Sequence, residues 1–227
     1  MAIDRRTFAL SALAAIASPA SASDLYQPLN KRVRWRGLGK GDILFDDPFE
    51  RSRPGAVRQP YSSWSPNGSD TKAAQLLSLV GFAEAGRLQY DAIHMSARRR
   101  PHRQPTQLSL SEIESWIKST PGQHHAIGRY QFIPSTLISL KNRAALPGHA
   151  RFSRDVQDQL GYLLLLDAGY KKFEDGKLPV SRFMDNMAKI WAGLPTRNGR
   201  SAYHGYAGNR ATISRTFFAN QMIRIFS

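Results

Sequence analysis

The chain has 227 residues, no cysteine and a formal net charge of +15 at pH 7. The lack of cysteine excludes disulfides, thiolate metal sites and a cysteine nucleophile. With 41% hydrophobic and 22% charged residues, the composition is that of a globular protein and not of a wholly disordered one. So large a positive charge indicates an anionic partner, and nucleic acid, anionic lipid and cell-wall polymer all fit it.

The first 22 residues have the layout of an export signal. Arg5 and Arg6 precede a short apolar stretch, residues 8–16, and residues 20–22 (ASA) resemble a cleavage site. The stretch is too short to span a bilayer. The two arginines favour the twin-arginine route, although a general secretory signal can also carry them. We therefore expect a periplasmic or secreted protein with no integral membrane segment after removal of residues 1–22, which argues against a nucleic-acid partner.

Residues 23–69 predict an extended basic arm that is rich in proline and glycine. A short strand is expected at residues 42–45. Basic residues between 31 and 40 alternate with apolar ones. Two readings stay open for them: a solvated arm that packs across the following domain, or an electrostatic contact to an anionic polymer.

From residue 70 onward, apolar residues recur at helical spacing. Asp70 or Thr71 can cap the first helix, and Ser109 with Glu112, or Ser111 with Glu114, can form a capping box for the second. The predicted helices begin near residue 70 and then cover 111–118, 134–145, 153–173, 179–192 and 211–226.

The long polar segment between the first two helices, residues 87–108, contains a basic run at 98–103. A loop of this length is uncommon unless it is functional or carries small strands. We therefore predict a mainly α (α+β) domain at residues 70–227, with a small irregular or β insertion after its first helix.

Glu84 stands where the first predicted helix gives way to this loop. An apolar run precedes it, so the carboxyl should be partly buried, and burial raises the pKa of a carboxyl group. A carboxylic acid that keeps its proton near neutral pH can donate it to a glycosidic oxygen, which is a poor leaving group. The position also fits a solvated glutamate near a helix end, although carboxylates prefer helix N-termini.

Four stretches resemble, in the same order, the lambda-type phage endolysins and their bacterial muramidase relatives within the lysozyme-like superfamily. The resemblance covers about residues 72–226, and each stretch alone is a weak signal. The stretches are residues 82–86 (FAEAG), 90–93 (YDAI), 118–120 (KST) leading to 128–131 (GRYQ), and 190–195 (IWAGLP) followed by 201–205 (SAYHG).

This resemblance implies a lysozyme-like fold and cleavage of the β-1,4 bond between N-acetylmuramic acid and N-acetylglucosamine in peptidoglycan. It makes Glu84 the catalytic acid and implies that Tyr130 and Gln131 line the saccharide groove. Tyr203 would lie near the groove. Trp191 fits a core residue better than a sugar platform.

No second carboxylate stands out, and Asp91, counted among the candidate substrate-binding residues, is the nearest. Glycosidases usually use two carboxylates. The resembled family works with one glutamate and is known for lytic transglycosylation, in which the acid protonates the glycosidic oxygen. Its conjugate base then accepts a proton from the muramyl C6 hydroxyl, which attacks the anomeric carbon and yields a 1,6-anhydro product. The lack of an evident partner for Glu84 therefore favours a transglycosylase over a hydrolase.

Rival readings come from other classes of protein. A non-catalytic cell-wall-binding or assembly protein could keep the fold without depending on Glu84. The histidines, with an adjacent pair at 124–125, lack the spacing of zinc-protease ligands, so we expect no metal and no cofactor. The basic run at 98–103 fits a solvated loop that meets anionic wall carboxylates, and a secretion or surface apparatus as partner is not indicated by any motif.

Overall fold

A computed structural model describes residues 70–206 and 208–227. The predicted export signal, the predicted arm and the strand expected at residues 42–45 lie outside these residues. The described part is mainly α, as predicted, and contains no strand, only isolated β-bridges. None of its helices is long and apolar enough to span a bilayer.

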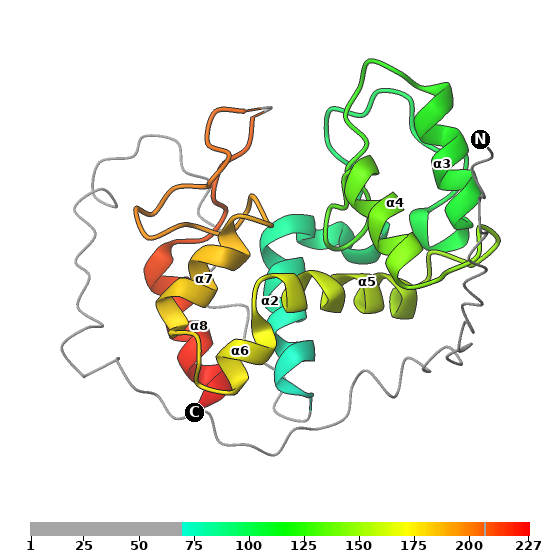
Figure 1. Ribbon diagram of the computed structural model, residues 1–227. Coiled ribbons are helices and arrows are strands. Elements are labelled where there is room, and N and C mark those ends of the chain that lie inside the picture. The colour runs from blue at the N-terminus through cyan, green and yellow to red at the C-terminus, as the bar shows by residue number, and fades with distance from the viewer. Residues whose placement is uncertain (1–69, 207) are drawn as a thin grey trace, which may run out of the picture.

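The helices form two groups that α2 and α5 connect (Figure 1). One group holds α3 and α4 with the loops around them, and the other holds α6, α7 and α8. The elements are α2 (Lys72–Ala85), η3 (Gly86–Asp91), η4 (Pro105–Gln107), α3 (Leu110–Ser119), α4 (Pro134–Arg143), α5 (Arg154–Asp167), α6 (Tyr170–Glu174), α7 (Val180–Ala188) and α8 (Arg215–Phe226).

Helix α2 lies in the middle of the molecule, and its sequence explains why. Thr71 caps it, with its side chain accepting a hydrogen bond from the Ala74 amide at 3.2 Å. Apolar residues surround most of the helix instead of forming a single stripe, a pattern of helices buried on all sides. Leu76, Leu79 and Val80 are accordingly without solvent contact.

The capping signals read from the sequence are largely confirmed. Ser109 and Glu112 form a reciprocal capping box at the start of α3, at 3.2 and 2.7 Å. Ser153 caps α5 through the Val156 amide. Each cap satisfies a backbone donor that a helix start would otherwise leave unpaired.

Four predicted helices are shorter than expected, and the one predicted over residues 134–145 ends at Arg143. The helix predicted over residues 153–173 breaks at Gly169, whose φ of 97° is left-handed and ends α5 before α6 begins. The helix predicted over residues 179–192 ends at Ala188. The last helix begins only at Arg215, with Ser214 as its cap, because the residues before it make tertiary contacts instead.

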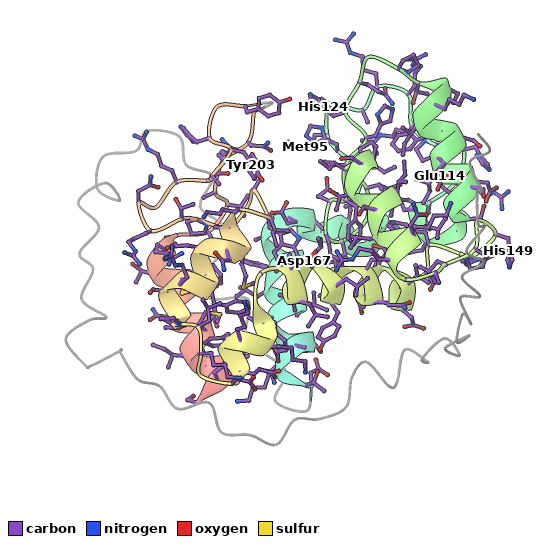
Figure 2. The ribbon with its side chains drawn as sticks, in the orientation of Figure 1. Met95, Glu114, His124, His149, Asp167 and Tyr203 are labelled. Atoms are coloured by element: carbon purple, nitrogen blue, oxygen red, sulfur yellow. The ribbon has the colours of Figure 1, made fainter. Side chains whose placement is uncertain are left out.

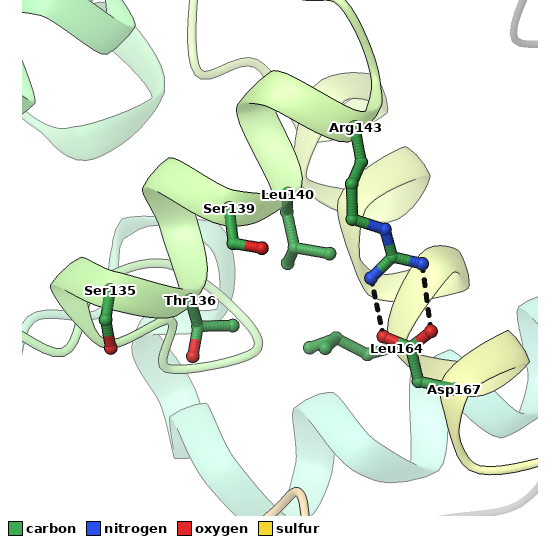
Figure 3. A pocket seen from close by; sticks show the side chains of 7 residues that line it. All are labelled: Ser135, Thr136, Ser139, Leu140, Arg143, Leu164 and Asp167. Atoms are coloured by element: carbon green, nitrogen blue, oxygen red, sulfur yellow. Dashed lines mark hydrogen bonds and ion pairs between the residues drawn. The ribbon is translucent and has the colours of Figure 1, made fainter.

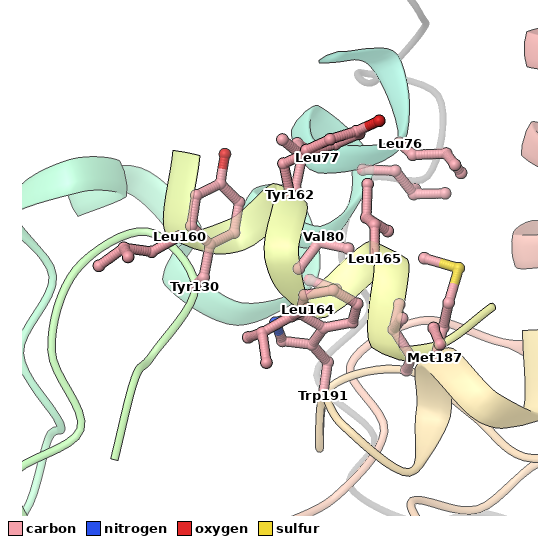
Figure 4. Packing of buried hydrophobic residues seen from close by; sticks show 14 of the residues in the cluster. Leu76, Leu77, Val80, Tyr130, Leu160, Tyr162, Leu164, Leu165, Met187 and Trp191 are labelled. Carbon is pink, nitrogen blue, oxygen red and sulfur yellow. The ribbon is translucent and has the colours of Figure 1, made fainter. Parts of the chain in front are cut away.

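The core fills the space between α2, α5 and α7 (Figure 4). It is built from residues with almost no solvent exposure, and such close packing holds the two helix groups in place. The members that Figure 4 labels are Leu76, Leu77, Val80, Tyr130, Leu160, Tyr162, Leu164, Leu165, Met187 and Trp191.

The insertion predicted after the first helix is irregular and carries bridges instead of strands. It begins with the 3₁₀ turns of η3 and continues to η4. Ile93 pairs with Ile127, and Ile127 pairs with Phe132 across a tight turn. These bridges fix the loops that lie beside the C-terminal end of α2.

Candidate functional site

Glu84 lies in the last turn of α2, at the junction with η3. Its side chain is partly buried, although Ala83 before it is almost fully buried. The Gly193 amide donates a hydrogen bond to Oε1 of Glu84 at 2.6 Å. The other carboxyl oxygen, Oε2, has no hydrogen-bond partner among the residues that the structure describes, so it is free to carry a proton toward a ligand.

The surroundings of Glu84 favour the neutral acid. Burial raises the pKa of Glu84 from 4.5 to about 7, and the hydrogen bond from the Gly193 amide lowers it by a smaller amount. Desolvation disfavours the carboxylate, because the protein supplies less stabilisation of its charge than water does. The neutral acid is therefore populated near neutral pH, where the group can both donate and accept a proton.

Two residues from the C-terminal part of the chain fasten the end of α2. Thr212 donates through its hydroxyl to the Ala83 carbonyl at 2.7 Å and through its amide to the Gly193 carbonyl at 2.9 Å. Gly193 lies so close to α2 that a Cβ there would stand 2.6 Å from the Ala83 carbonyl oxygen and 3.0 Å from Oε1 of Glu84. Only glycine fits this approach.

No protein-family model, curated protein or solved structure matches this chain. The chemistry of the Glu84 carboxyl and the groups around it is therefore the basis on which a function is assigned.

Asp91 is committed to a structural contact. Its Oδ1 accepts hydrogen bonds from the Thr106 amide at 2.9 Å and from the Thr106 hydroxyl at 2.7 Å. These bonds tie the end of η3 to η4 and orient the insertion. The structure therefore gives Oδ1 of Asp91 a structural partner, and its expected ligand contact stays a prediction.

Tyr130 does not line a groove, and this expectation from the resemblance is corrected. Its side chain is only 2% exposed, and its hydroxyl donates to Asp158. Asp158 also accepts from the Tyr90 hydroxyl, at 2.9 Å, and burial raises the pKa of this carboxyl. Arg129 donates to the Tyr90 hydroxyl and covers the Tyr90 ring at 4.7 Å. Tyr130 thus belongs to a buried polar cluster between α5 and the insertion.

Gln131 shapes the turn that Ile127 and Phe132 close. Its φ of 47° is left-handed, and its side-chain amide donates to the Gly128 carbonyl at 2.9 Å. The side chain remains partly exposed. The structure therefore gives Gln131 a local role and leaves some of its surface for a ligand.

Tyr203 is the predicted site residue that offers most surface. It is 42% exposed and its hydroxyl donates to the Lys189 carbonyl at the end of α7. It lies in the loop that also supplies Gly193 and Thr212. Figure 2 shows it across from Met95 and His124, which belong to the other helix group, at the end of the molecule where α2 meets η3. Trp191, by contrast, is a core residue with 2% exposure, as expected.

Sequence reasoning missed Gly193 and Thr212 as site residues. Gly193 lies within the stretch 190–195, but its contact with the end of α2 is a feature of the tertiary structure. Thr212 has no local signal at all. In the described part of the chain, no three His, Asp or Glu side chains gather as a metal site would require.

A cavity of about 310 Å³ opens elsewhere, between α4 and α5 (Figure 3). Arg143 and Asp167 close one end of it through paired hydrogen bonds of 2.7 and 2.9 Å, so their charges offset each other. Glu84 does not line this cavity, which separates it from the candidate site. Its lining consists of Ser135, Thr136, Ser139, Leu140, Arg143, Leu164 and Asp167.

Proposed function

We propose that this protein is a peptidoglycan-cleaving enzyme in which Glu84 is the general acid, and that it acts as a lytic transglycosylase. The observation that carries the proposal is the partly buried Glu84 carboxyl in the last turn of α2, whose Oε1 accepts the Gly193 amide at 2.6 Å and whose pKa is raised by burial to about 7. The substrate is the glycan strand of the cell wall, cut between N-acetylmuramic acid and N-acetylglucosamine, outside the cytoplasm.

The first step is protonation of the glycosidic oxygen by Glu84. With Oε1 held by the Gly193 amide, the free Oε2 carries the proton to the leaving oxygen. The glycosidic bond then breaks, and the anomeric carbon develops positive charge. Fixing one carboxyl oxygen limits the directions from which the other can approach the substrate, which contributes to orientation.

The second step needs a base, and the same side chain supplies it. The Glu84 carboxylate accepts the proton of the muramyl C6 hydroxyl while that oxygen bonds to the anomeric carbon, which gives the 1,6-anhydro sugar and restores the acid. A hydrolase would use a second carboxylate or an activated water. Asp91 accepts two hydrogen bonds from Thr106, which supports the reaction that needs only one carboxylate.

The arrangement of elements supports a lysozyme-like domain. Glu84 lies in the last turn of the central helix α2, and an irregular insertion follows it. The long helix α5 passes through the core beside α2. The positive charge of the chain supports a partner whose peptide stems carry carboxylates.

The test is digestion of purified sacculi by residues 23–227, followed by mass spectrometry of the released muropeptides. We expect products lighter by one water than those of a hydrolase. We expect Glu84→Gln to lower the rate by roughly 100-fold or more. Asp175→Asn removes an exposed carboxyl on the far helix group and is the matched control. Solubilisation by Glu84→Gln at the parent rate would show that the acid assignment is wrong.

The rival function, a wall-binding or assembly protein without catalysis, gives a different result in the same experiment. Such a protein would sediment with sacculi and release no muropeptide, and Glu84→Gln would leave the sedimented fraction unchanged.

A further inference from the structure

Two histidines are held side by side at the end of the molecule where α2 meets η3. The His94 amide donates to the Ala126 carbonyl at 2.9 Å, next to the bridge between Ile93 and Ile127. This antiparallel pairing brings the His94 and His124 rings to a centroid distance of 4.9 Å, with an angle of 43° between them. His124 is exposed and His94 is partly buried.

The contacts of His94 define which nitrogen carries its proton. The Ser96 amide, which can only donate, points at Nδ1 of His94 from 3.3 Å. The Ser96 hydroxyl lies 2.8 Å from the same nitrogen. Nδ1 therefore accepts, and the neutral ring carries its hydrogen on Nε2. His94 thus keeps a donor that Ser96 does not occupy.

Among the described residues, no carboxylate pairs with either of these histidines. Neither ring lies within ion-pair distance of an Asp or Glu in residues 70–206 and 208–227, whereas His102 lies 3.6 Å from Glu112. Ser96, which also contacts the His94 ring, is neutral. Burial, and then the neighbouring His124, lower the pKa of His94.

The next histidine along the chain, His125, has partners of its own. His125 is buried, its Nε2 lies 2.8 Å from the Thr120 hydroxyl, and its ring packs against Trp116. The exposed residues that follow His94 include Arg98 and Arg100, which add positive charge to the same loop. The two-histidine surface therefore combines donors with an unbalanced basic environment.

Its place in the fold connects it to the Glu84 site. Figure 2 shows Met95, which follows His94 and is 94% exposed, together with His124 on the side that faces Tyr203. The end of α2 lies between these two sides in Figure 1. A glycan that extended from Glu84 toward the side of Met95 and His124 would present its substituents to the histidines.

We propose that His94 and His124 form a binding site for a carboxylate of the peptide stems, which gives the enzyme a preference for glycan that carries stems. The two oxygens of a carboxylate accept one hydrogen bond from each ring, and the anion removes the repulsion between the rings when they are protonated. This inference rests on the proposed function, because stems reach the histidines only on a bound wall strand.

The test compares two substrates: intact sacculi, and the same glycan after an amidase has removed the stems. We expect His124→Ala to lower the rate on intact sacculi by about tenfold, as for loss of one charge-assisted hydrogen bond, and to leave the rate on stripped glycan unchanged. His149→Ala is the matched control, because this exposed histidine lies on the far side of the α3 and α4 group (Figure 2). An unchanged ratio of the two rates in His124→Ala would overturn the inference.

A binding measurement separates this inference from the proposed function. In Glu84→Gln, the ring resonances of His94 and His124 should shift on addition of a disaccharide tetrapeptide and not on addition of the peptide-free disaccharide, while His149 stays constant. Equal shifts with both probes, or none, would contradict the carboxylate site. If the parent cleaves neither substrate while the shifts appear, the proposed catalysis fails and the carboxylate site stands.

Discussion

Replacing Glu84 by glutamine should stabilise the protein at alkaline pH and not at acid pH. A rise in the pKa of Glu84 from 4.5 to about 7 corresponds to about 3 kcal/mol of unfavourable free energy for the buried carboxylate. This value is an upper limit, because part of the side chain remains in contact with solvent. Glutamine has no charge to desolvate, and its Oε1 can still accept the Gly193 amide.

The sign follows from proton binding. Between pH 4.5 and 7 the folded protein holds a proton that the unfolded chain has released, so stability falls as the pH rises through this window. Below pH 4.5 both states are protonated, and the parent and Glu84→Gln should have nearly equal free energies of unfolding. Above pH 8 the variant should be more stable by up to about 3 kcal/mol.

Urea unfolding, followed by tryptophan fluorescence at pH 4.5 and pH 8.5, measures this difference. Asp175→Asn controls for the loss of one surface charge, since Asp175 is exposed and near Lys177. An advantage of Glu84→Gln that is the same at both pH values would refute the claim that burial keeps this carboxyl protonated.

Further predictions concern the groups that surround the carboxyl. Gly193→Ala should destabilise the fold by about 1–3 kcal/mol, because its Cβ would lie 2.6 Å from the Ala83 carbonyl oxygen; a normal melting temperature would contradict this close approach. Thr212→Val should cost about 1–2 kcal/mol through loss of its hydroxyl bond to α2, measured by denaturant unfolding with Thr212→Ser as the variant that keeps the bond. Tyr130→Phe should cost about 1–3 kcal/mol, because it removes one of the two hydroxyl donors to Asp158 and leaves only that of Tyr90. Wall digestion by the folded fraction should keep its KM; a raised KM with normal stability would show instead that Tyr130 contacts the substrate.

The helix starts could be predicted because their signals are local. The capping box of Ser109 and Glu112 involves residues three positions apart, so the sequence alone contains both partners. Thr71 is likewise adjacent to the helix that it caps. The position of Glu84 at the end of an apolar helix was predictable for the same reason.

The helix ends were less predictable because tertiary contacts decide them. The apolar pattern of residues 153–173 continues through Gly169, and only the left-handed φ of that glycine reveals the break. Residues 211–214 fit a helix by composition. The chain instead uses Thr212 to fasten α2, and the helix begins after Ser214.

In the candidate site, too, contacts between residues far apart in the sequence could not be predicted. Gly193 contacts Glu84 across 109 positions, and no spacing in the sequence indicates such a contact. The resemblance placed Tyr130 in the groove, and the motif alone does not indicate whether this aromatic side chain is buried or exposed. Its partner Asp158, 28 positions away, decides that it is buried.

The distance along the chain between Glu84 and Gly193 also orders events during synthesis. When the ribosome has just made α2, the side chain of Glu84 in its last turn is still exposed to water. Gly193, which donates to Glu84, and Thr212, which donates to the Ala83 carbonyl, have not yet been synthesised. Helix α8, which packs on α2, also follows later. The ability of Glu84 to keep its proton near neutral pH is therefore acquired late in folding, and a chain truncated before residue 193 would carry the glutamate without the hydrogen bond from the Gly193 amide.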